Sequence, residues 1–193
     1  MKNGPWTHSS PNAQAYPRSD EHFVEPEWVS ARLFEEEPFR GKIYDPACGF
    51  GRIVTAAIQA GHSAYGSDIT DRGWDSTPQD FFAHTDLHDN IVCNPPFALL
   101  SAFSHRALTR SRHKVAMLWP VARLNAARWL QDTPLLRIWL LSPRPSMPPG
   151  HVITDGGKAS GGKTDYCWLV WQNGASNGHP EIRWMCRDEA SKP

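Results

Sequence analysis

The sequence predicts a single α/β domain on a doubly wound, mostly parallel sheet that ends in an antiparallel C-terminal hairpin. Strand-like apolar runs alternate with helix-like segments through most of the chain, which is typical of parallel sheets with helical crossovers. A glycine-rich turn links the first strand to the next helix, as in ligand-binding α/β folds. Two late apolar runs flank the turn-rich NGASNGHP, which favours a hairpin.

Each element follows from a local pattern. Trp28, Val29, Leu33 and Phe34 recur at helical spacing, so a helix is expected over about 27–36. The strand KIYDPA leads into CGFG, and the helix RIVTAAIQAG ends at its C-terminal glycine. The remaining elements, in chain order, are the strands SAYGSDI and NIVC, the helix LLSAFSHRALTRSR, the strand KVAMLWPV, the helix ARLNAARWLQ, the strand LLRIWLLS and the paired strands DYCWLVWQ and EIRWMCR.

The chain length and composition fit one soluble domain with a real core. The chain has 193 residues, of which 40% are hydrophobic and 21% charged. The polar N-terminus has no signal-peptide segment, so a cytoplasmic location is expected. The four cysteines form no CxxC pair and are interpreted as buried free thiols. The expected organisation is a flexible arm 1–21, a domain 22–188 with a mobile substrate loop 142–164, and a tail 189–193.

The first chemical motif is DPACGFG, residues 45–51, between a strand and a helix. Glycines there let the backbone approach a ligand closely, and a helix N-terminus favours polar groups. Asp68 ends the next strand, where a carboxylate can accept hydrogen bonds from ribose hydroxyls. A simple strand-end cap is the alternative for Asp68. Asp45 precedes the glycines, where a carboxylate can meet the ammonium group of a ligand.

The second motif is Asn94-Pro95-Pro96-Phe97, directly after the apolar strand NIVC. Two prolines end a strand, and open α/β sheets bind ligands at strand carboxyl ends. With DPACGFG and GSDI upstream, this motif resembles that of the S-adenosylmethionine-dependent methyltransferases that act on amino groups, especially the N6-adenine DNA methyltransferases. The resemblance covers roughly residues 22–172.

The resemblance implies S-adenosylmethionine as the cofactor, DNA as the substrate and the adenine amino group as the methyl acceptor. That amine is a poor nucleophile, because its lone pair is delocalised into the ring. The Asn94 side-chain oxygen and the Pro95 carbonyl would hold its hydrogens, with Pro95 and Pro96 giving rigidity, and Phe97 would stack on a flipped base. A separate recognition domain is not apparent, so short or relaxed specificity is expected.

Two weaker matches extend the resemblance. TPQDFF would place Asp80 and Phe81 at the adenine of the cofactor, although an acidic loop residue beside a core phenylalanine is an equal alternative. HFVEPEW would pack Phe23, Glu25 and Pro26 against the methionine part, although it also fits a proline-opened helix start. The expected cofactor residues are Phe23, Glu25, Pro26, Asp45, Pro46, Ala47, Gly49, Gly51, Asp68, Ile69, Asp80 and Phe81.

The zero net charge conceals an asymmetry. Residues 1–100 carry 7 Lys and Arg against 14 Asp and Glu, whereas residues 101–165 carry 10 against 3. Such a basic segment suits the phosphates of a nucleic acid, and ordinary solvated helix faces are an equal alternative. The expected nucleic-acid contacts are Arg106, Arg110, Arg112, Lys114, Arg144, Lys158 and Lys163.

Two other patterns are set aside. GKASGGKT matches the phosphate-loop pattern, but strand-like DYCWLVW follows it where that loop requires a helix. His84 and His88 outline a metal half-site with Asp86 and Asp89, but the turn-like AHTDLHDN favours a solvated loop, and no metal is predicted.

Three rival functions stay open. They are an RNA methyltransferase acting on adenine or guanine amines, a protein glutamine methyltransferase, and a cofactor-binding module that has lost catalysis. The intact NPPF argues against lost catalysis, and the basic segment favours a nucleic acid over a protein. Nothing in the sequence separates DNA from RNA or gives the target site or oligomeric state.

Overall fold

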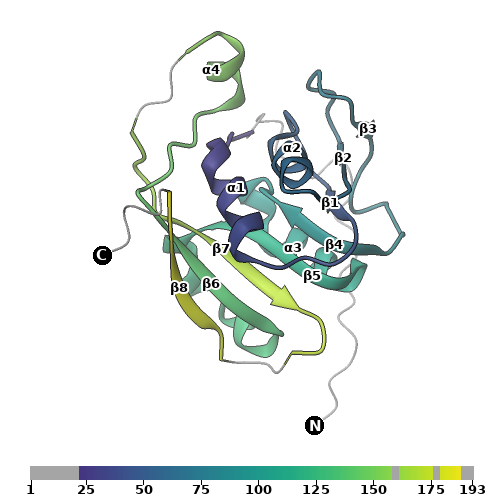
Figure 1. The fold of residues 1–193 in the computed structure, drawn as a ribbon, viewed down its shortest axis with the longest axis vertical. Helices are drawn as coiled ribbons and strands as arrows, with labels where there is room; N and C mark the ends of the chain where they lie inside the picture. The colour runs from purple at the N-terminus through teal and green to yellow at the C-terminus, as the bar shows by residue number, and fades with distance from the viewer. Residues whose placement is uncertain (1–21, 158–160, 176–178, 188–193) are drawn as a thin grey trace.

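The computed structural model describes residues 22–157, 161–175 and 179–187, which form an eight-stranded sheet with helices on both faces (Figure 1). The strands lie in the order β3-β2-β1-β4-β5-β7-β6-β8. Their bounds are β1 Ile43–Asp45, β2 Ala64–Asp68, β3 Thr77–Pro78, β4 His88–Cys93, β5 Ser111–Pro120, β6 Leu135–Ser142, β7 Tyr166–Gln172 and β8 Glu181–Cys186. The α/β class with a mostly parallel sheet is confirmed. The predicted arm 1–21 and tail 189–193 lie outside the described residues.

The parallel part of the sheet brings the predicted motifs to one edge. β1 pairs in parallel with both β2 and β4, and β4 pairs in parallel with β5. The carboxyl ends of these strands therefore point the same way. Asp68 ends β2, and Asn94 directly follows β4.

The predicted C-terminal hairpin is wrong in its pairing. β7 is antiparallel to both β5 and β6 and lies between them, whereas β8 pairs in parallel with β6 at the edge of the sheet. The first six residues of β7 are buried, as expected for an interior strand with both faces covered. Because both sides of β7 are occupied, β8 cannot pair with it. The turn-rich sequence between β7 and β8 predicted a turn but did not indicate which strand β8 pairs with.

Helices cover the two faces of the sheet around separate cores. α1, Glu27–Glu36, and α2, Arg52–Gln59, pack over one face, where Leu33 and Ile53 join a core with Trp168. α3, Leu100–Arg110, packs over the other face with Phe103 and Trp171 in the second core. Figure 1 shows α1 and α2 in front of the sheet in that view. The loops that leave the carboxyl ends of the strands thus emerge between two packed layers.

The observed helices agree with the predicted ones except where the elements are short. α1 has the predicted bounds. The helix predicted over ARLNAARWLQ forms two 3-10 helices, η3 Val121–Ala126 and η4 Arg128–Asp132, which Ala127 separates at φ −99° and ψ 51°. The sequence pattern missed β3, the 3-10 turn η2 Phe97–Leu99 and α4 Gly150–Thr154, because such short elements carry too few residues to show a period.

Three smaller expectations are also resolved. Cys48, Cys93 and Cys167 are buried free thiols as predicted, whereas Cys186 is half-buried. The segment GKASGGKT leads into strand β7 rather than a helix, as expected. In the described part of the chain, every helix is too short or too polar to cross a bilayer.

Candidate active site

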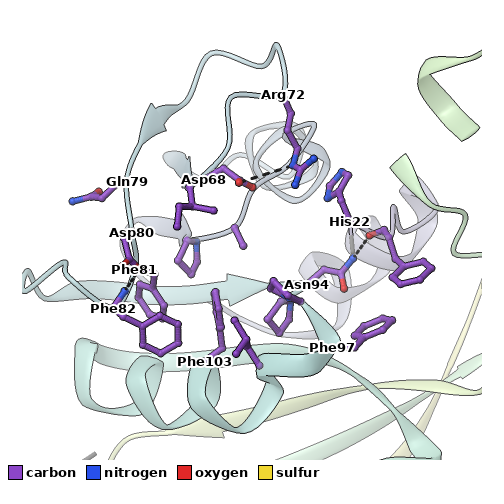
Figure 2. Close-up of a pocket in the computed structure, with 17 residues that line it drawn as sticks. His22, Asp68, Arg72, Gln79, Asp80, Phe81, Phe82, Asn94, Phe97 and Phe103 are labelled. Atoms are coloured by element: carbon purple, nitrogen blue, oxygen red, sulfur yellow. Dashed lines mark hydrogen bonds and ion pairs between the residues drawn. The ribbon is translucent and has the colours of Figure 1, made fainter. Parts of the chain in front are cut away.

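A cavity opens at the carboxyl ends of β1, β2 and β4, where parallel sheets bind ligands (Figure 2). All four predicted catalytic residues, Asn94 to Phe97, line it. Seven of the twelve predicted cofactor residues also line it, namely Phe23, Pro46, Ala47, Asp68, Ile69, Asp80 and Phe81. The cavity thus brings together four predicted motifs from residues 46–97, namely DPACGFG, GSDI, TPQDFF and NPPF.

The glycine loop shapes the cavity rather than lining it. Gly49 and Gly51 have φ of 52° and 72°, a left-handed conformation that glycine adopts without steric cost. A Cβ at Gly49 would overlap the His22 ring, and one at Gly51 would overlap the Trp74 ring. Both glycines are therefore required by backbone conformation and by close packing. Their predicted role in cofactor binding acts through the shape of the loop.

Asp68 fastens the glycine loop to β2 and still faces the cavity. Its Oδ2 accepts the Gly49 N–H at 2.9 Å, and its Oδ1 accepts the Thr70 N–H at 2.9 Å. Arg72 Nε lies 3.9 Å from Oδ1, and Figure 2 shows this pair at the upper rim of the cavity. Each carboxylate oxygen has two lone pairs, so acceptor capacity remains for ligand hydroxyls. The strand-cap and ligand roles are compatible in this geometry.

An aromatic floor closes the other end of the cavity. Phe81 is buried, and its ring centroid lies 5.3 Å from that of Phe103 on α3. Asp80 accepts the Phe82 N–H at 2.8 Å, which fixes the turn that presents these rings. Figure 2 shows Asp80, Phe81, Phe82 and Phe103 grouped together, away from Asn94. Apolar rings with one carboxylate beside them suit an aromatic ligand that carries an amino group.

Asn94 has its amide orientation fixed by two acceptors. Its Nδ2 donates to the Phe23 carbonyl at 2.8 Å and to Glu25 Oε2 at 2.8 Å. Because the Phe23 carbonyl can only accept a hydrogen bond, the nitrogen must face it, and Oδ1 faces away. Both amide hydrogens are used in these bonds. The atom left for a ligand is therefore a hydrogen-bond acceptor.

A second cavity adjoins the first across two aromatic rings. Phe23 and Phe97 line both cavities, and their rings are stacked with centroids 5.4 Å apart and planes at 11°. The Tyr166 ring centroid lies 5.7 Å from that of Phe97, and Arg123 donates to the Phe97 carbonyl at 2.5 Å. Lys163 also lines the second cavity. Arg123 belongs to the predicted basic segment, whereas sequence patterns missed Tyr166, because it comes from β7, distant in the chain from NPPF.

Part of the predicted substrate loop 142–164 forms the outer wall of this second cavity. Met147 and Val152 line it, the latter from α4. The Val24 N–H donates to the Pro148 carbonyl at 2.9 Å, and the Gly150 N–H donates to the His22 carbonyl at 2.7 Å. These bonds tie the loop to the segment that holds Asn94. His22 also lines the first cavity and went unnoticed in the sequence.

The remaining predicted cofactor residues lie behind the cavity wall. Glu25 and Asp45 are 6% and 1% exposed and line a small neighbouring cavity that Asn94 also borders. Burial raises the pKa of Asp45 well above its usual value, and the nearby Glu25 carboxylate adds to the effect. Burial likewise raises the pKa of Glu25, against the opposing effect of its hydrogen bonds. Pro26 precedes α1 as its cap residue.

Most of the predicted nucleic-acid residues hold the fold together. Arg106 donates to the Phe82 and His84 carbonyls, Arg110 to the Thr85 carbonyl, and Arg112 to the Leu87 carbonyl. These three arginines therefore clamp the loop between β3 and β4. Arg112, which is exposed, also lies 3.5 Å from Asp89.

The other predicted nucleic-acid residues have separate surroundings. Lys114 is buried and pairs with Glu37 at 2.8 Å, together with Arg137, at the start of β5 and away from the cavity. This placement removes Lys114 from the expected interface. Arg144 forms an exposed bidentate pair with Asp165 at 2.6 and 3.2 Å. Lys158 lies outside the described residues.

His84 and His88 form a hydrogen-bonded pair instead of a solvated loop. Their Nε2 atoms are 3.0 Å apart, and the Tyr65 hydroxyl lies 2.7 Å from His88 Nδ1. The Tyr44 ring stacks on His88 with centroids 3.9 Å apart. His88 is buried, which corrects the expectation of a solvated site. Within the described ranges, these histidines join no group of three or more potential metal ligands.

Comparisons with known proteins support the fold. No protein-family model matches the chain, and no curated protein matches it in sequence. A Listeria monocytogenes structure described as a class I S-adenosylmethionine-dependent methyltransferase aligns at TM-score 0.54 and 13% identity, over 93% of this chain and 70% of that one. The fold is that of the class I methyltransferases.

Other solved structures with this methyltransferase fold have different substrates. The M protein of the type I restriction enzyme EcoKI aligns at TM-score 0.57 and 12% identity, over 88% of this chain and 49% of that one. Magnesium protoporphyrin IX methyltransferase from Synechocystis, solved with bound SAM, aligns at 0.52 and 17%, over 77% and 76%. At these identities the likeness establishes the methyltransferase fold, and the chemistry must be argued from the site.

Proposed function

We propose that this protein is a methyltransferase that moves a methyl group from S-adenosylmethionine to the exocyclic amino group of adenine in DNA. The methyltransferase fold and the cavity at the strand ends support the cofactor class. The orientation of the Asn94 amide is the observation that supports an amino group as the methyl acceptor. Because both of its amide hydrogens are used by Phe23 and Glu25, it offers an acceptor to the cavity, as an amino-group substrate requires.

The residues of the first cavity fit the cofactor. Asp68 would accept hydrogen bonds from the ribose hydroxyls with its remaining lone pairs. Asp80 would accept from the adenine amino group, with Phe81 packed beneath the ring. Pro46, Ala47 and Ile69 would complete the walls. Bound there, S-adenosylmethionine supplies an electrophilic methyl group.

Asn94 and its neighbours would prepare the substrate amine. The Asn94 Oδ1 and the Pro95 carbonyl would accept the two amine hydrogens and turn the nitrogen towards the methyl group. The chain supplies no separate base in this proposal. The nitrogen becomes acidic after it accepts the methyl group and would release one proton to water, and the cofactor would leave as S-adenosylhomocysteine. Phe97 and the neighbouring rings of Phe23 and Tyr166 would form an aromatic surface against which the target base stacks.

A nucleic acid substrate is supported by the second cavity. It is lined by aromatic and proline side chains, with Arg123 and Lys163 as its cations. Such a cavity suits a base removed from its stack, with phosphates held at the rim. The structural neighbours include the EcoKI M protein, a restriction-enzyme subunit, and the 23S rRNA methyltransferase ErmE, which supports a nucleic acid as the substrate class.

One experiment tests the proposal directly. The protein is incubated with tritiated S-adenosylmethionine and separate pools of DNA, RNA and protein, and the labelled product is identified by mass spectrometry. Label in N6-methyladenine from DNA is expected. Label only in RNA or only in glutamine would replace DNA with that substrate. No label in any pool, despite cofactor binding, would favour an interaction module.

A further inference from the structure

Glu25 stands behind the catalytic amide and not in the main cavity. Asn94 lines both the main cavity and the small cavity behind it, whereas Glu25 lines only the small one. The side chain of Glu25 is therefore separated from the expected cofactor site by Asn94. A role for Glu25 in the reaction has to pass through that amide.

The contact between the two side chains decides which atom Asn94 presents. Nδ2 of Asn94 is 2.8 Å from Glu25 Oε2 and 2.8 Å from the Phe23 carbonyl. The two ends of an asparagine amide have nearly the same shape, so packing alone distinguishes them poorly. With the amide reversed, Oδ1 would face the Phe23 carbonyl, which cannot donate, and the Glu25 carboxyl, which cannot donate when it is ionised. The carboxyl group of Glu25 thus adds a second acceptor that disfavours the reversed amide.

The position of Glu25 is itself held firmly. Arg52 Nη1 donates to the Glu25 carbonyl at 2.7 Å, and the preceding Val24 N–H donates to Pro148 at 2.9 Å. The side chain is 6% exposed, with Asp45 and Arg52 as its charged neighbours. A carboxylate and a carboxylic acid both retain a carbonyl-type acceptor. Glu25 can therefore accept the Asn94 N–H in either protonation state.

We propose that Glu25 is a positioning residue, which holds the Asn94 amide with its oxygen towards the substrate and does not bind the cofactor. This inference rests on the proposed function and refines the role of the FVEP segment, which was expected to pack against the methionine part of the cofactor. It predicts that changes at Glu25 act on turnover. A cofactor ligand at this position would act on cofactor affinity instead.

Two substitutions at Glu25 separate these roles. Glu25→Gln keeps an acceptor oxygen for Asn94, so turnover should stay within about threefold of wild type, whereas Glu25→Ala removes it and should lower kcat about tenfold or more, by misorientation of a reacting group. Affinity for S-adenosylmethionine, measured by calorimetry, should stay within about twofold in both. Glu27→Ala is the matched control, because Glu27 lies on the same segment and is exposed.

A second measurement is independent of catalysis. In a protein labelled with ¹⁵N on asparagine, the Asn94 side-chain NH₂ signals are identified by their absence in Asn94→Asp. They should exchange slowly with solvent in wild type and in Glu25→Gln, and faster in Glu25→Ala. If Glu25→Ala leaves both kcat and this protection unchanged, or lowers cofactor affinity in step with activity, the proposal is overturned. A wild-type protein inactive on DNA would count against the proposed function alone, since the exchange measurement still decides the role of Glu25.

Discussion

Asp68 couples the glycine loop to the expected ribose site, because one carboxylate serves both. It accepts backbone N–H groups from Gly49 and Thr70 and still lines the cavity. Removing it should therefore loosen the loop as well as delete a ligand contact. Both effects come from one side chain, so a measurement of cofactor binding detects them.

Asp68→Ala should weaken S-adenosylmethionine binding by about 10- to 150-fold, since a hydrogen bond to a charged group is worth about 1.5–3 kcal/mol. Calorimetry measures the change. Asp71→Ala is the control, because Asp71 accepts the Gly73 N–H in the loop that follows β2 and is exposed. Equal affinity in wild type and Asp68→Ala would take Asp68 out of the cofactor site.

Substitutions at the two ends of the NPPF motif should affect different steps, the methyl transfer and the binding of DNA. Asn94→Ala should lower turnover by about 100-fold or more while cofactor affinity stays nearly constant, because the amide acts on the amine in the transition state. Phe97→Ala should mainly raise KM for DNA, by loss of stacking worth about 1–3 kcal/mol per base. Steady-state kinetics with both substrates varied distinguishes them. Near-normal turnover in Asn94→Ala would contradict the mechanism.

At the level of elements, the sequence predicted what local periodicity determines. The bounds of α1, the strand before NPPF and the loop between β1 and α2 follow from spacing and turn residues within about ten positions. The pairing of β8 with β6 does not, because it depends on which strand edge remains free after β7 has inserted. For the same reason Tyr166 could not be assigned to the site before the sheet was known. Lys114 and Asp45 show that a charged residue in a pattern gives no indication of its burial.

The pair of His84, in the connection from β3 to β4, and His88, the first residue of β4, should make the stability of the fold depend on pH. Burial first, and then the neighbouring His84, lower the pKa of His88 to about 4. In the unfolded chain a histidine titrates near about 6.5, so the unfolded state takes up a proton at a higher pH than the folded state. Stability should therefore fall as pH drops from about 6.5 towards 4, and this contribution should be constant above about 7.

Thermal melting across pH 4–8 measures this effect, with His88→Asn as the comparison variant. Wild type should lose stability in the acid window more steeply than the variant, which lacks the titrating ring. Asp86, Asp89 and Arg112 also act on the His88 ring and stay unchanged in the variant. Parallel pH profiles for the two proteins would show that the His84–His88 pair does not control acid stability.

At the scale of the whole molecule, only part of the basic segment is placed where it can contact a nucleic acid. Arg106, Arg110 and Arg112 bind loop carbonyls, and Lys114 is buried. The cations that border the second cavity are Arg123 and Lys163. The number of phosphates held is therefore expected to be small. The described residues form one sheet with its covering helices and contain no separate domain for reading base edges.

This architecture predicts a short or relaxed target with binding dominated by phosphates. Reading several base pairs usually requires a helix or ribbon that carries several side chains into the major groove. Lys163→Ala should weaken binding to all DNA sequences alike and reduce the salt dependence by about one phosphate contact. Binding titrations at several salt concentrations measure the slope, and sequencing of methylated DNA gives the target. A single site of six or more defined bases, read by this chain acting alone, would show that the residues around the second cavity recognise far more sequence than their number and chemistry indicate.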